Sequence, residues 1–72
     1  MNLKINGEKE LLDYESLTVS ELLAVKNVKM PDMVSVELNG DILDRETFDS
    51  TALKNNDEVE FLYFMGGGEY GL

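Results

Sequence analysis

The chain has 72 residues, with 15 acidic and 6 basic side chains and a net charge of −9. This length suits one domain, and such an acidic surface repels nucleic acids and anionic membranes, whose binding needs clustered lysine and arginine. The absence of cysteine and histidine removes disulfides, zinc fingers, thiol nucleophiles and imidazole bases. We therefore expect a non-enzyme with no cofactor of its own. No segment resembles a signal peptide or a bilayer-spanning stretch, so we expect a cytoplasmic protein.

The first part of the chain carries signals for a hairpin and a helix. Leu3 and Ile5 alternate with polar neighbours before Asn6-Gly7, the dipeptide most typical of a two-residue hairpin turn. Thr18 and Glu21 then form a capping box, in which each side chain accepts a hydrogen bond from an unpaired backbone N–H. We expect a helix that begins at Val19, ends near residue 27 and buries one apolar face.

The second part of the chain predicts three more strands. Pro31 prevents continuation of the helix, and residues 34–38 alternate with period two before a second Asn-Gly turn. A short strand at 41–43 precedes a helical turn at 45–48, where we expect Phe48 in the core and Arg45 in a local ion pair. The last strand, 58–64, places three side chains on the inner face, Val59, Phe61 and Tyr63, and four on the outer face, Glu58, Glu60, Leu62 and Phe64.

This element order predicts an α+β fold in which a mixed sheet of four to five strands packs on one main helix. We expect the domain to cover residues 1–65. The first and last strands are the most apolar, so we expect them side by side in the middle of the sheet.

Three glycines, Gly66, Gly67 and Gly68, follow the last strand. Glycine loses more backbone freedom on folding than any other residue, so a glycine run is a poor choice for packed structure. Without Cβ atoms it can pass through a narrow channel and bring a carboxyl group to a partner's active site. We therefore expect residues 66–72 to form a flexible tail, with Glu69 to Leu72 as an extension beyond the glycines.

Five segments in this order resemble the ThiS family of thiamine-biosynthesis sulfur carriers, and the resemblance runs from Met1 to Gly68. It implies a ubiquitin-like β-grasp fold, with the first and last strands parallel. The segments are Leu17-Thr-Val-Ser-Glu-Leu-Leu23, Val36-Glu-Leu-Asn-Gly-Asp-Ile42, Asp44-Arg-Glu-Thr-Phe48, Asn56-Asp-Glu-Val-Glu60 and Phe64-Met-Gly-Gly-Gly68.

The resemblance also implies a mechanism in which the glycine tail is the substrate of partner enzymes. A ThiF-like enzyme would use ATP and Mg²⁺ to adenylate the terminal glycine carboxylate, and sulfur from a persulfide donor would displace AMP. The resulting thiocarboxylate would supply sulfur to a ThiG-like thiazole synthase. Similar carriers feed molybdopterin, cysteine or homocysteine pathways, so those destinations remain alternatives.

The chain departs from the family pattern because Glu69 follows Gly68. Adenylation of Gly68 requires a free carboxylate, so we expect removal of Glu69 to Leu72, by a protease such as the JAMM-type metalloproteases that process some similar carriers. The alternative is a ubiquitin-like interaction module that is never conjugated.

The outer face of the last strand offers a candidate docking patch beside the tail. It consists of Leu62, Phe64, Met65 and Glu60. Exposed apolar clusters usually mark contact surfaces, so we expect partner enzymes to dock here, although neighbouring strands could instead cover these side chains.

Overall fold

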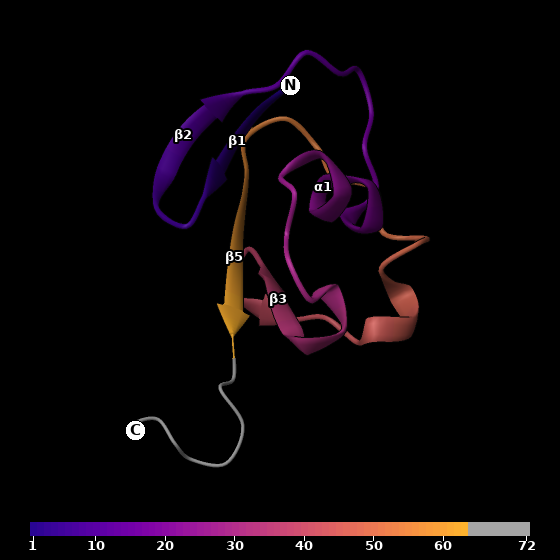
Figure 1. The fold of residues 1–72 in the computed structure, drawn as a ribbon. Helices are drawn as coiled ribbons and strands as arrows, with labels where there is room; N and C mark the ends of the chain where they lie inside the picture. The colour runs from indigo at the N-terminus through magenta and orange to yellow at the C-terminus, as the bar shows by residue number, and fades with distance from the viewer. Residues whose placement is uncertain (64–72) are drawn as a thin grey trace.

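The computed structural model describes residues 1–63, in which five strands form one mixed sheet. The strands are β1 (Asn2–Ile5), β2 (Glu8–Leu11), β3 (Val34–Leu38), β4 (Asp41–Ile42) and β5 (Asp57–Tyr63), in the spatial order β2-β1-β5-β3-β4. β5 runs parallel to β1 and antiparallel to β3. The prediction that the first and last strands are adjacent and parallel is therefore confirmed, and β5 is the central strand (Figure 1). The predicted domain boundary at residue 65 lies outside the described residues.

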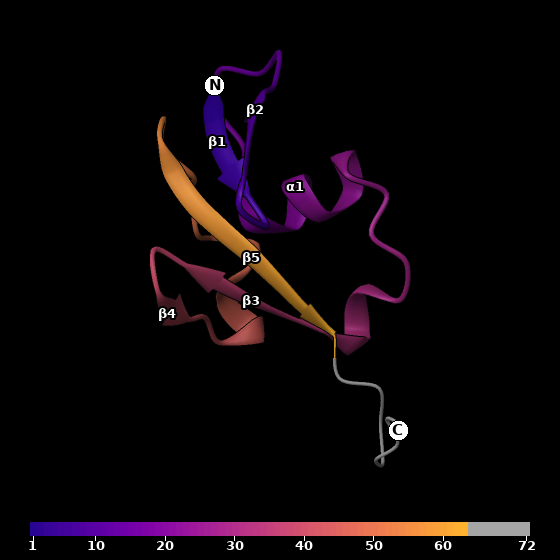
Figure 2. The same ribbon diagram turned by 90° about the vertical axis from the view of Figure 1, so that its left-hand side faces the viewer.

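The helix α1 (Val19–Val25) begins where the capping box predicts. Thr18 Oγ1 accepts a hydrogen bond from the Glu21 N–H at 3.1 Å, and Glu21 Oε1 accepts one from the Thr18 N–H at 2.8 Å. These two bonds satisfy backbone donors that the first helical turn leaves unpaired. The apolar face of α1 packs on one side of the sheet, and Figure 2 shows the other side, which no helix of residues 1–63 covers.

One apolar core fills the space between α1 and the sheet. Strands β1, β3 and β5 contribute every second residue to it, as their alternating sequences predict. Phe48 enters the core directly after the 3₁₀ turn η2 (Arg45–Thr47), as expected. The buried apolar residues are Leu3, Ile5, Leu17, Val19, Leu22, Leu23, Val34, Val36, Phe48, Leu53, Val59 and Phe61.

Tyr63 keeps the parity of Val59 and Phe61 along β5, but it is 50% exposed, and Figure 2 shows the end of β5 extending past α1. One sequence-based expectation was wrong. Arg45 forms no ion pair with any residue in the range 1–63; its guanidinium instead donates hydrogen bonds to the backbone carbonyls of Pro31 and Val34. The only ion pair among these residues joins Lys26 to Glu10, at 2.5 Å.

Candidate functional site

Strand β5 is the last described element before the three glycines in the sequence. β5 pairs with β3 along its length, from Leu38 opposite Val59 to Val34 opposite Tyr63. Its pairing with β1 stops earlier, at Ile5 opposite Val59. The predicted tail residues Gly66, Gly67 and Gly68 lie outside the described residues.

Two asparagines hold β5 from opposite sides. Asn6 and Asn39 each begin an Asn-Gly turn in the left-handed conformation, with φ of 52°. On the β1 side, the Asn6 N–H donates to Val59 O at 2.9 Å, and Asn6 Oδ1 accepts from the Phe61 N–H at 2.9 Å. The Asn6 side chain thus extends the ladder after β1 has ended.

On the β3 side, Asn39 binds the beginning of β5. Its N–H donates to Glu58 O at 2.7 Å, and its Oδ1 accepts from the Glu58 N–H at 2.9 Å. Its Nδ2 donates to Asp57 Oδ1 at 3.0 Å, and Asp57 Oδ2 accepts from the Lys54 N–H at 2.7 Å. These bonds give the buried Asp57 carboxylate two partners, so the strand that leads to the tail is anchored at its start.

The predicted docking patch is described only in part. Glu60 is exposed and Leu62 is half-buried, and both lie on the sheet face that α1 does not cover. Glu60 stands directly opposite Glu37 on β3, an arrangement of like charges that destabilises a sheet slightly. Phe64 and Met65 lie outside the described residues, so docking through this patch stays a prediction.

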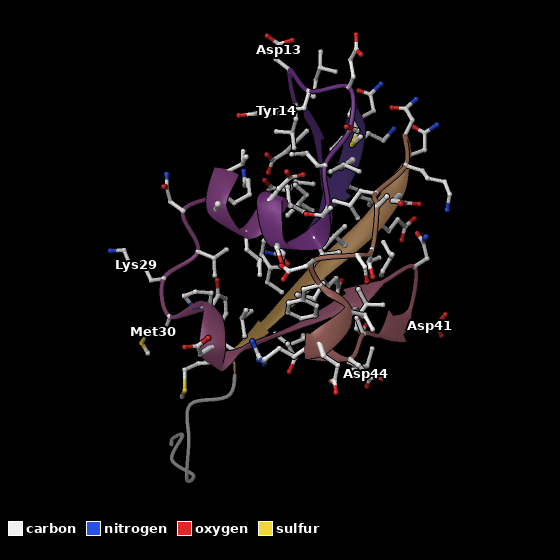
Figure 3. All side chains as sticks on the ribbon, turned by 90° about the vertical axis from the view of Figure 1, so that its right-hand side faces the viewer. Asp13, Tyr14, Lys29, Met30, Asp41 and Asp44 are labelled. Atoms are coloured by element: carbon white, nitrogen blue, oxygen red, sulfur yellow. The ribbon has the colours of Figure 1, made fainter. Side chains whose placement is uncertain are left out.

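The structure adds three exposed apolar side chains that sequence reasoning missed at the same end of the molecule. They are Tyr63, Met30 before the 3₁₀ turn η1 (Pro31–Met33), and Met33 within it, with exposed fractions of 50%, 62% and 47%. Figure 3 shows Met30 at the end of the molecule opposite Asp13 and Tyr14. A groove of about 560 Å³ lies beside Tyr63, with Phe61, Val28 and Lys29 in its lining. Loop methionines beside a proline have no periodicity, so no sequence signal marked them.

Neither a metal site nor a membrane span is found in the described part of the chain. No three aspartate or glutamate side chains among residues 1–63 converge as metal ligands would, and histidine and cysteine are absent from the sequence. Over the same range, no helix has the length and apolar character needed to cross a bilayer.

Comparisons with known proteins agree with this geometry. The chain matches the ThiS family over residues 2–68. It is 30% identical over 66 residues to the sulfur carrier protein ThiS of Bacillus subtilis, a match that covers 92% of this chain and 98% of that protein. It is also 31% identical over 70 residues to a thiazole synthase of Magnetococcus marinus, where the match covers 97% of this chain but spans only 21% of that protein.

Solved structures give the same result. The crystal structure of the thiamine biosynthesis protein ThiS from Geobacter metallireducens superposes with a TM-score of 0.87 and 55% identity, covering 94% of this chain and all of that one. The solution structure of a thiamine biosynthesis protein from the same organism gives a TM-score of 0.80 and 52% identity, covering all of this chain and 94% of that one. The predicted β-grasp fold is confirmed, and the chain belongs to the ThiS family.

Proposed function

We propose that this protein is a sulfur carrier for the thiazole of thiamine, and that Gly68 becomes its reactive terminus. The observation that carries this proposal is the extent of the family match, which runs through residue 68 and so includes all three glycines. The protein supplies a folded domain that partner enzymes recognise and a C-terminal tail that they modify, and the partner enzymes supply the catalysis.

The chemistry begins with a carboxylate, which is a poor acylating group. In the proposed sequence, the Gly68 carboxylate attacks the α-phosphorus of ATP on a ThiF-like enzyme, with Mg²⁺ at the phosphates, and pyrophosphate leaves. A persulfide sulfur then attacks the acyl carbon and AMP leaves, which gives an acyl disulfide. A second thiol reduces this disulfide and releases the glycyl thiocarboxylate. None of these steps needs a cysteine or histidine of the carrier, and the sequence has neither.

A ThiG-like thiazole synthase is the proposed acceptor of this sulfur. The Magnetococcus marinus thiazole synthase supports this assignment, because a stretch like the present chain occupies 21% of its length. A carrier-like segment and a protein named for thiazole synthesis thus share one polypeptide in that organism.

The peptide bond between Gly68 and Glu69 must be cut before adenylation, because an amide oxygen is a much weaker nucleophile than a carboxylate. A JAMM-type metalloprotease is the proposed agent.

The test is the intact mass of the protein purified from its own host, grown with and without thiamine. The proposal predicts a chain that ends at Gly68, with sulfur in place of one terminal oxygen in a fraction of molecules that grows under thiamine limitation. In a host without the thiazole synthase, the thiocarboxylate should accumulate. A sulfur-free chain that retains Glu69 to Leu72 under both conditions would contradict the proposal and favour a module that is never conjugated. A thiocarboxylate fraction that is the same with and without thiamine would indicate that the sulfur goes to another pathway.

A further inference from the structure

Three of the six large apolar side chains that are exposed among residues 1–63 surround the end of β5. Val34 pairs directly with Tyr63, so the turn that precedes β3 and the end of β5 lie together. We call Met30, Met33 and Tyr63 the collar. The other three exposed apolar residues, Leu11, Tyr14 and Ile42, lie on β2, in the loop after it, and on β4.

Met30 holds its exposed position at a conformational cost. Its φ of 55° is left-handed, a region that L side chains enter at a cost of roughly 1–2 kcal/mol. The described chain has four other left-handed residues that are not glycine, and all four are asparagine, which tolerates this conformation. At Met30 alone the sequence keeps a large apolar side chain, and that side chain is 62% exposed. Core packing therefore does not explain it, and strain of this kind tends to concentrate at functional positions.

Arg45 fixes the methionine turn in place. Its Nη1 donates to Pro31 O at 2.8 Å and its Nη2 donates to Val34 O at 2.7 Å, while its guanidinium lies 5.5 Å from the centre of the Phe48 ring. The Met33 N–H closes the turn on Met30 O at 2.8 Å. The two methionines thus project from a clamped backbone, and Arg45 acts as a positioning residue.

The short sequence distance between Tyr63 and Gly68 limits how far from the collar an enzyme that acts on Gly68 can lie. Gly68 lies five residues beyond Tyr63, and five fully extended residues reach at most about 18 Å. An enzyme that holds the Gly68 carboxylate in its active site must therefore lie against the end of β5. This argument rests on the proposed function.

We propose that the collar is the docking surface for the adenylating enzyme, through an apolar patch of that enzyme at the mouth of the channel that receives the tail. The net charge of −9 favours a partner with a basic face, while Lys29, Asp32 and Arg45 give the collar itself a mixed local charge. Methionine suits the role because its unbranched, polarisable side chain adapts to irregular partners.

The test compares Met30→Asn with Leu11→Gln. Met30→Asn removes the apolar contact but places a well-tolerated residue in the left-handed conformation, so its thermal midpoint should equal or exceed that of the wild type. Leu11→Gln removes a more exposed apolar side chain, 76% accessible, from β2, away from the collar. Each protein is purified from its own host, and its KM is measured in ATP–pyrophosphate exchange with the ThiF-like enzyme of that host. We expect Met30→Asn to raise the KM about tenfold and Leu11→Gln to leave it unchanged.

The outcomes separate this inference from the proposed function. If the wild type supports exchange and Met30→Asn has an unchanged KM, the docking role of the collar is refuted and the proposed function stands. No exchange with wild-type protein whose mass shows a free Gly68 carboxylate would overturn both. A wild-type dimer in sedimentation that Met30→Asn dissociates would assign the collar to a second copy of the chain, and this also would overturn the proposal.

Methyl-labelled methionine provides a second readout. The chain has four methionines, and Met1 lies in the N-terminal part, half-buried against the core. Addition of the enzyme should shift or broaden the methyl signals of Met30 and Met33 and leave that of Met1 unchanged. Equal effects on all three signals would contradict a localised contact.

Discussion

Replacing Asn6 by alanine tests whether a single side chain anchors the strand that presents the tail. Asn6 Oδ1 accepts the Phe61 N–H at 2.9 Å in a partly buried setting, at a position where β1 no longer pairs with β5. Alanine would leave that donor unpaired, at a cost of about 1–3 kcal/mol. It would also occupy a left-handed position, with φ of 52°, which adds roughly 1–2 kcal/mol.

The expected loss is therefore about 2–5 kcal/mol in the free energy of unfolding. A domain of this size has roughly 4–11 kcal/mol in total, so the thermal midpoint should fall by about 10 °C or more. Urea unfolding followed by circular dichroism measures the free energy, and amide hydrogen exchange reports on Phe61 directly. Asn6→Asp is the matched control, because aspartate retains the acceptor oxygen and tolerates the left-handed conformation.

The reasoning predicts that Asn6→Ala speeds exchange at the Phe61 amide more than at the Glu60 amide, which faces β3 instead. A loss of no more than about 2 kcal/mol, which the backbone cost alone would explain, together with unchanged exchange at Phe61 would refute it. Equal destabilisation by Asn6→Asp would also count against the hydrogen bond, since that variant keeps the acceptor.

Three further predictions follow from the same geometry. Arg45→Met loses two hydrogen bonds to carbonyls but keeps an apolar contact with Phe48, so we expect urea unfolding to show a loss of about 1.5–3 kcal/mol; a loss below about 0.5 kcal/mol would mean that the clamp contributes little. Glu60→Lys replaces the like-charge pair with Glu37 by an opposite-charge pair and should stabilise the fold by roughly 0.5 kcal/mol, with the gain lost in high salt. Gly67→Val should abolish ATP–pyrophosphate exchange at unchanged thermal stability; retained exchange would refute the narrow-channel argument.

The features that sequence predicted correctly are governed by local chemistry. A capping box specifies a helix start through residues three apart, and Asn-Gly specifies a hairpin turn through the two dihedral angles it tolerates. Both signals were accurate in residue number, with α1 at Val19 and the turns at Asn6 and Asn39. The central place of β5 agrees with the alternation that gives the strand one apolar, buried face at Val59 and Phe61.

The features that sequence missed depend on contacts between distant segments. The expected local ion pair of Arg45 does not form among residues 1–63, because the fold places the guanidinium against the carbonyls of Pro31 and Val34. Tyr63 has the inward parity of a core residue but is 50% exposed, at an end of β5 that extends past α1 (Figure 2). Parity within a strand predicts a face of the sheet, but the length of the covering helix decides whether that face is buried.

The short reach from Tyr63 to Gly68 also limits how the proposed partners can share the carrier. The adenylating enzyme and the thiazole synthase must each bring Gly68 into their own active site, and the reach of about 18 Å places either enzyme against the end of β5. They must therefore bind one at a time, and the first must dissociate before the second can accept sulfur. The collar must therefore bind two different partners, each with moderate affinity. The flexible side chain of methionine can adapt to two different surfaces better than a rigid branched side chain can. Excess thiazole synthase should consequently inhibit adenylation by competition with the activating enzyme, and a ternary complex isolated with both enzymes on one carrier would contradict this sequence of events.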